Sequence, residues 1–158
     1  MVTRIIERIS IRSRAVEVIE TFAQDPSHWI SPFFKIAAFE GERIGEEVRV
    51  SMGMERAPSD DHLVLIEFER PQPLIGGGVV FPFRWRAAGL PALFSSFAGR
   101  IVIWPRFETE TWLVIEGEAS ADSASNGAST AIMRRAASAA IRSLAGNLKA
   151  AFEESLRL

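Results

Sequence analysis

The 158-residue sequence contains no cysteine and no tyrosine. The absence of cysteine excludes disulfide bonds, thiolate chemistry and zinc sites built on cysteine. Without tyrosine, the aromatic surface consists of 11 phenylalanines and 4 tryptophans, so it favours apolar contacts over hydrogen bonds. The net charge is only −2, and the sequence therefore has no electrostatic footprint of a nucleic-acid partner.

Long apolar runs and metal-binding patterns are also missing. No apolar run is long enough to span a membrane, and the first ten residues alternate and carry charges, unlike a signal peptide. We therefore expect a cytoplasmic protein without membrane insertion. The two histidines, His28 and His62, lack metal-ligand spacing, so we predict no metal. The GGG run at 76–78 matches no phosphate-binding motif, and we predict a turn or a loop at a cavity mouth there, and no cofactor.

The residues that are present indicate one domain over 1–158, since no repeat or linker divides the chain. Alternation of apolar and polar residues predicts strands over 2–12, 35–43, 46–54, 62–70, 79–87, 100–104 and 109–119. On the fifth of these, Phe81, Phe83 and Trp85 share one side, and Arg84 and Arg86 share the other.

Helical spacing predicts two short helices after the first strand, separated by a break at Pro26. Apolar residues at intervals of three and four predict one long amphipathic helix within 128–158. Because no helix separates the later strands, the sheet must be largely antiparallel, and six or seven twisted strands curl into a concave face. The prediction is an α+β helix-grip fold, in which the curved sheet wraps around the C-terminal helix.

Three stretches resemble the START/SRPBCC superfamily, which includes Bet v 1-like proteins, polyketide cyclases/dehydrases and lipid-transfer domains. They are ISIRSRAVEVIETFAQDPSHWISPFF, RIVIWPRFETETWLVIEGEA and the terminal helix. Val16 stands where the family often has proline, and the positions that match the family's front motif are Ile11, Ala15, Val18, Asp25 and Trp29. The resemblance implies a deep cavity between sheet and helix, but it does not imply one function.

We interpret the chain first as a binding or transport protein for a small hydrophobic molecule held in that cavity. The expected lining consists of Val50, Met52, Ile66, Phe68, Phe83, Trp85, Trp104, Leu113, Ile141, Leu144 and Leu148. One alternative is an interaction module. Segment 89–98 is either a lid over the cavity or an interface with another subunit, which leaves a homodimer open.

The other alternative is an enzyme of the polyketide cyclase/dehydratase type. It needs acid or base groups inside the cavity, and the candidates are Glu7, His62 and Arg84. Glu7 shares the apolar side of its strand, so it could orient a ligand or act as a general acid or base. The competing interpretation of Glu7 is a salt bridge to an arginine.

Overall fold

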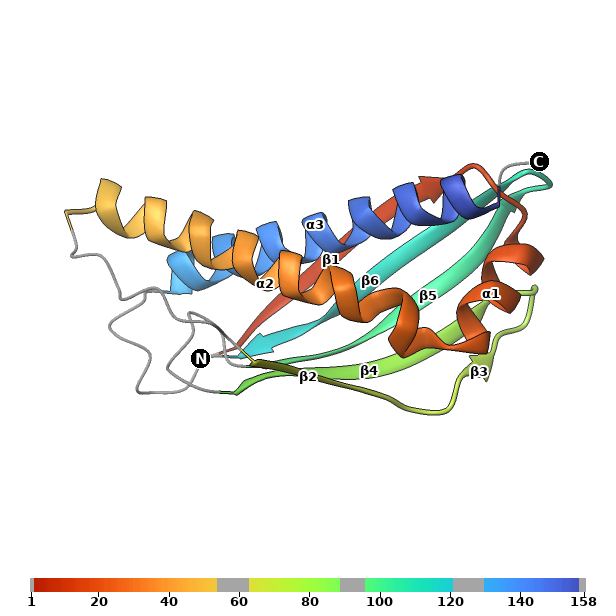
Figure 1. Cartoon of the computed structure of the whole chain (residues 1–158), viewed down its shortest axis with the longest axis horizontal. Helices are drawn as coiled ribbons and strands as arrows, with labels where there is room; N and C mark the ends of the chain where they lie inside the picture. The colour runs from red at the N-terminus through yellow and green to blue at the C-terminus, as the bar shows by residue number, and fades with distance from the viewer. Residues whose placement is uncertain (1, 54–62, 89–95, 121–129, 157–158) are drawn as a thin grey trace.

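The computed structural model describes residues 2–53, 63–88, 96–120 and 130–156 (Figure 1). Along the chain, the elements are β1 (Val2–Ile11), α1 (Ala15–Gln24), α2 (Pro26–Ser51), β2 (Leu63–Phe68), β3 (Gln72–Pro73), β4 (Val79–Ala88), β5 (Ser96–Phe107), β6 (Glu110–Ser120) and α3 (Thr130–Ser155).

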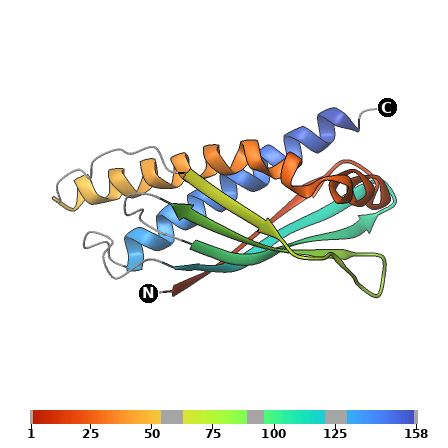
Figure 2. The ribbon, with the colours of Figure 1, turned by 60° about the horizontal axis from the view of Figure 1, so that its bottom comes forward.

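The described strands form one antiparallel six-stranded sheet in the order β1-β6-β5-β4-β2, with β3 paired to β4. The long helices α2 and α3 lie side by side on one face of this sheet (Figures 1 and 2). Helix α1 contacts β5 and β6 near one end of the sheet. The fold class is confirmed as a helix-grip arrangement, and the sheet has six strands.

Alternation along β4 sorts its side chains between the two faces of the sheet. Phe81, Phe83 and Trp85 are buried on the helix-covered face, whereas Arg84 and Arg86 are exposed on the uncovered face. This confirms the sidedness predicted from period two. The apolar stripe of α3 is buried as well, from Ile132 to Phe152.

Two glycines bring β5 and β6 close together on the helix-covered face. Gly99 and Gly117 are cross-strand partners, and a Cβ atom on Gly99 would lie 2.2 Å from the Glu116 carbonyl oxygen. It would also lie 2.6 Å from the Phe97 ring, so that ring covers the glycine pair. A side chain at either position has no room, which explains why glycine is required inside these strands.

The strands predicted over 35–43 and 46–54 are wrong, because residues 26–51 form the single helix α2. Asp25 caps this helix by accepting a hydrogen bond from the His28 N–H at 3.1 Å, and Pro26 occupies its first turn. The predicted break at Pro26 is confirmed, because α1 ends at Gln24 and α2 begins at Pro26, but α2 has 26 residues and is not short. The buried stripe of α2 has helical spacing and consists of Ile30, Phe34, Ala37, Ala38, Gly41, Gly45 and Arg49.

Two further boundaries differ from the sequence prediction. Strand β5 continues through Phe107, so the turn before β6 is shorter than the PRFE segment suggested. Residues 96–98 of the segment expected to be a lid or interface belong to β5, and residues 89–95 lie outside the described residues.

Candidate functional site

The helix-covered face of the sheet carries a continuous layer of aromatic rings. Phe83 and Phe97 stack with ring centroids 5.6 Å apart, and Phe34 meets Phe83 at 5.7 Å. Phe22 of α1 contacts Phe81 edge-on at 4.7 Å. None of these rings has a hydroxyl group, so the layer interacts mainly through burial and ring–ring contacts. We call this set of rings the aromatic layer; its members are Phe22, Phe34, Phe68, Phe81, Phe83, Trp85, Phe97 and Phe152.

The C-terminal end of α3 is attached to this layer by Phe152. Its ring stacks on Trp29 of α2 at 4.7 Å with an interplanar angle of 19°. It also meets the edge of Phe22 at 6.1 Å. One side chain of α3 thus holds α1 and α2 against the end of the sheet.

The structure brings most of the predicted lining residues together. Phe83, Trp85 and Leu113 on the sheet and Ile141, Leu144 and Leu148 on α3 are all at most 3% exposed. All six belong to the buried hydrophobic core cluster. Ile66 and Phe68 of β2 are only partly buried and pack against the margin of this core.

Three predicted lining residues lie elsewhere. Val50 is on α2 and Met52 is at its C-cap, and they are 43% and 59% exposed. Trp104 lies on the uncovered face of the sheet, where its ring contacts the 76–78 glycine run of the β3–β4 turn. The GGG run is a turn, with Gly76 and Gly77 at positive φ.

Strand β2 gives the aromatic layer an open margin, because it is the last strand of the sheet on that side. Phe68 contacts Phe22 at 5.9 Å and Phe83 at 5.8 Å, so it continues the layer to this margin. Helix α2 lies over β2. We call Ile66 and Phe68 the β2 margin.

Of the three catalytic candidates, the structure describes Glu7 and Arg84, and these two lie on opposite faces of the sheet. Glu7 lies on edge strand β1, facing α3, and its Oε1 is 3.9 Å from Arg142 Nε. Its side chain is 24% exposed, so this ion pair is at the rim of the core. Arg84 is exposed on the uncovered face, and His62 lies outside the described residues.

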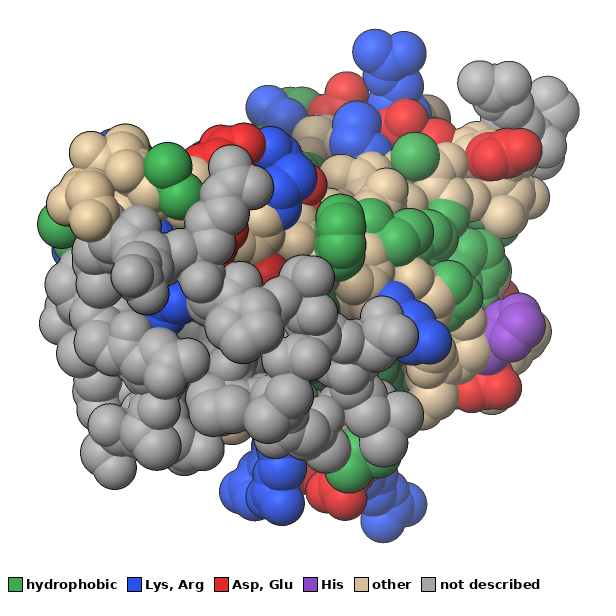
Figure 3. Space-filling model, turned by 60° about the vertical axis from the view of Figure 1, so that its left-hand side comes forward, with side chains coloured by type: hydrophobic (Ala, Val, Ile, Leu, Met, Phe, Trp, Pro, Cys, Tyr) green, Lys and Arg blue, Asp and Glu red, His purple; other side chains and the backbone are tan. Residues whose placement is uncertain are grey.

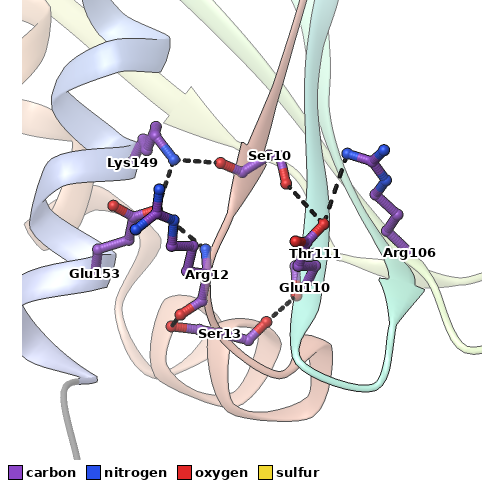
Figure 4. Close-up of polar contacts among 8 residues, drawn as sticks. All are labelled: Ser10, Arg12, Ser13, Arg106, Glu110, Thr111, Lys149 and Glu153. Atoms are coloured by element: carbon purple, nitrogen blue, oxygen red, sulfur yellow. Dashed lines mark hydrogen bonds and ion pairs between the residues drawn. The ribbon is translucent and has the colours of Figure 1, made fainter.

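A polar cluster that sequence reasoning missed joins β1, β6 and α3 (Figure 4). Lys149 Nζ donates hydrogen bonds to the Ser10 carbonyl oxygen and to Glu153 Oε1, each at 2.5 Å. The Arg12 backbone N–H donates to the same Glu153 oxygen at 3.0 Å. The spacing of Lys149 and Glu153 by four residues was the available signal. Its link to β1 could not be seen in the local sequence.

Nearby, the buried Thr111 donates its hydroxyl to the Ser13 carbonyl oxygen at 2.7 Å. Burial acts to raise the pKa of Glu153, but the Lys149 hydrogen bond, the Arg12 N–H and both positive charges outweigh it. The pKa of Glu153 is therefore below its ordinary value of 4.5. These contacts fix the β1–α1 connection against the end of α3, which is a structural role.

The outer surface of the molecule mixes apolar and charged side chains. In the right half of Figure 3, hydrophobic side chains gather in one area, with Lys, Arg, Asp and Glu side chains around it. On α2, Ile36 and Phe39 are 51% and 72% exposed. Among the described residues, no helix is both long and apolar enough to cross a membrane.

No family model and no curated protein matches the sequence. Solved structures do match the whole chain. Protein TTHA0849 from Thermus thermophilus is 12% identical with a TM-score of 0.51, and the match covers 98% of this chain and 100% of that one. The Mll3558 protein from Rhizobium loti is 14% identical with a TM-score of 0.46, over 95% and 96% of the two chains.

A third match is the Zhui aromatase/cyclase from a Streptomyces species, strain R1128, at 10% identity and a TM-score of 0.42, covering all of both chains. At these identities the comparisons concern the fold alone. The strand order, the placement of the helices and the match to TTHA0849 agree on a helix-grip arrangement of sheet and helices.

Proposed function

We propose that the protein binds a small hydrophobic molecule on the helix-covered face of the sheet, entering at the β2 margin beneath α2. The observation that carries the proposal is the aromatic layer, which is free of hydroxyl groups and extends to the half-buried Phe68. Such a surface offers apolar area and ring contacts and few hydrogen-bonding groups.

The packing of the layer defines how the ligand is admitted. The deeper side chains are fully buried, so a ligand gains access only if α2 moves away from β2 or if rings change rotamer. We therefore infer that the protein exchanges between a closed state and a state in which α2 has moved away from β2, and that the ligand binds the second state. The observed affinity is then lower than that of the open state by the free energy of opening. The cytoplasm is the location that we propose for this activity, since the chain has no cysteine to require an oxidising compartment.

The test uses two neighbouring positions on β2 that point to opposite faces. Ile66→Trp fills the proposed entrance, whereas Leu65→Trp adds the same side chain on the uncovered face, where Leu65 is 51% exposed. Displacement of a fluorescent fatty-acid probe should show binding by the wild-type chain and by Leu65→Trp. Binding to Ile66→Trp should be weaker by about tenfold or more, as expected for a blocked apolar contact area.

Native mass spectrometry of the purified chain provides the second measurement, since a retained ligand adds mass. Ile66→Val, which keeps the shape but removes one methylene, should keep most of the binding and shows that Ile66→Trp acts by filling space. If neither measurement detects a bound apolar molecule in the wild-type chain, the proposed function is wrong. Equal binding by both tryptophan variants would place the ligand elsewhere.

A further inference from the structure

Two turns at one end of the molecule expose apolar side chains that the ligand proposal does not use. The turn between β3 and β4 carries Ile75, whose side chain is 99% exposed. Phe107 lies at the end of β5, beside the turn into β6, and is 62% exposed. Figures 1 and 2 place both turns at the same end of the molecule, and in Figure 2 the β3–β4 turn lies at the lower right, away from α2 and α3.

The two turns form one surface. A Cβ atom on Gly78 would lie 2.7 Å from the Trp104 ring, and one on Gly77 would lie 3.7 Å from Pro105 Cγ. The β3–β4 turn therefore lies directly against the stretch of β5 that leads to Phe107. We call Leu74, Ile75, Trp104, Pro105 and Phe107 the apolar tip.

The backbone conformation of the turn directs the Ile75 side chain outward. Gly76 and Gly77 have φ of 101° and 95°, which other residues rarely adopt. The Leu74 N–H donates to the Gly78 carbonyl oxygen at 2.7 Å, and the Gly77 N–H donates to the Leu74 carbonyl oxygen at 3.3 Å. This hydrogen-bonded turn holds Ile75 outward, at the cost of leaving an entire isoleucine side chain in water.

Amphipathic and charged side chains lie beside the apolar tip on the uncovered face of the sheet. Trp112 pairs with Trp104 across β5 and β6, on the uncovered face. The guanidinium groups of Arg106 and Arg8 lie 4.1 Å and 4.4 Å from the centroid of the Trp112 ring. Phe107 follows Trp104 by three positions, which is about 10 Å along a strand. The Arg106 guanidinium also lies 5.0 Å from the Phe107 ring centroid, so indole and guanidinium groups border the exposed apolar side chains. Amphipathic side chains of these types are enriched at bilayer interfaces.

We propose that the apolar tip inserts into the headgroup region of a lipid bilayer. A projecting turn of this shape fits a deformable surface, and the depth of about 10 Å matches the shallow burial of interfacial segments. Charges at the tip are mixed, since Arg106 is 3.6 Å from Glu110 and Glu108 is exposed. Insertion therefore relies on apolar area, and neutral phosphatidylcholine is sufficient. This contact is peripheral and needs no spanning segment.

The experiment measures co-sedimentation of the full chain with phosphatidylcholine vesicles. The double variant Ile75→Ser/Phe107→Ser should lower the partition coefficient by about tenfold or more, because two exposed apolar side chains are lost. The matched control Ile6→Ser/Leu65→Ser removes two side chains that are 58% and 51% exposed on the sheet, away from the tip, and should change it less than about twofold. The unfolding midpoints of both variants should equal that of the wild-type chain.

The salt dependence of vesicle binding distinguishes an apolar contact from an ionic one. Raising the ionic strength from about 0.1 M to about 1 M shortens the Debye length from about 10 Å to about 3 Å, and vesicle binding should persist. The proposal is overturned if the wild-type chain stays in the supernatant, if the control loses as much binding as the tip variant, or if salt abolishes the binding. It is also overturned if the chain forms oligomers that the tip substitutions abolish while the wild-type chain does not bind vesicles, because the tip is then an interface between copies of the chain. The assay needs no internal ligand, so its failure is distinguishable from failure of the proposed function.

Discussion

Replacing Phe152 by alanine tests whether α3 is held to the rest of the molecule through the aromatic layer. Phe152 is fully buried, stacks on Trp29 at 4.7 Å and meets the edge of Phe22 at 6.1 Å. Removing a buried phenyl group costs its transfer free energy and leaves a cavity, which together lower the free energy of unfolding by about 3–5 kcal/mol. For a chain of this length, that corresponds to a fall in Tm of roughly 6–20 °C.

Urea unfolding followed by circular dichroism measures this change, with Phe107→Ala as the matched control. The control makes the same substitution at a side chain that is 62% exposed, so it should change the free energy of unfolding by less than about 0.5 kcal/mol. If Phe152→Ala costs less than about 1 kcal/mol, or no more than the control, then the ring does not hold the helices together and the packing described here is incorrect.

Two further predictions concern glycines and the polar cluster. Gly99→Ala should destabilise the protein by about 1–3 kcal/mol, because its Cβ would overlap the Glu116 carbonyl oxygen. Gly146→Ala on α3 should instead stabilise the protein by about 0.5–1 kcal/mol, because the new Cβ meets nothing within 4 Å outside its own helix backbone. Thermal unfolding of the two variants checks this pair, and a stable Gly99→Ala would contradict the close β5–β6 contact. The lowered pKa of Glu153 contributes stability that is fully present above 4.5 and is lost as the pH falls through the pKa of the folded state. Glu153→Gln should therefore show a smaller loss of stability than the wild-type chain between about pH 7 and about pH 3, and an identical pH dependence would exclude this role.

The predictable elements of the fold are those in which large apolar side chains recur at the spacing of a strand or a helix. On β4, the large side chains Phe81, Phe83 and Trp85 alternate with polar ones, so period two is unambiguous. On α3, leucine, isoleucine and phenylalanine recur at helical spacing, and the stripe is buried as expected.

Helix α2 was mistaken for strands because its buried stripe includes small residues. Ala37, Gly41 and Gly45 are buried there, yet they add little to a hydrophobic pattern. The valines and methionines at 48–54 happen to recur at every second position, which imitates a strand. The ion pairs of Arg43 with Glu40 and Glu47, at spacings of three and four, were the local signal of a helix.

The candidate site was predictable only in part, because the missing information is not local. Trp104 follows the apolar run Ile101–Ile103, in which all three side chains are buried, so alternation does not assign a face. Its face follows from its register in the sheet, where it pairs with Trp112, and the glycine turn packs against its ring. Glu7 likewise obtains its partner, Arg142, from a helix far along the chain.

The most direct test of the ligand-binding proposal is an NMR titration of the full chain with a medium-chain fatty acid or with a flat aromatic molecule. The account predicts saturable amide shifts at Ile66 and Phe68 of β2 and along the face of α2 that covers them. Shifts confined to Arg84, Trp104 and the rest of the uncovered face, or no saturable shifts at all, would contradict it.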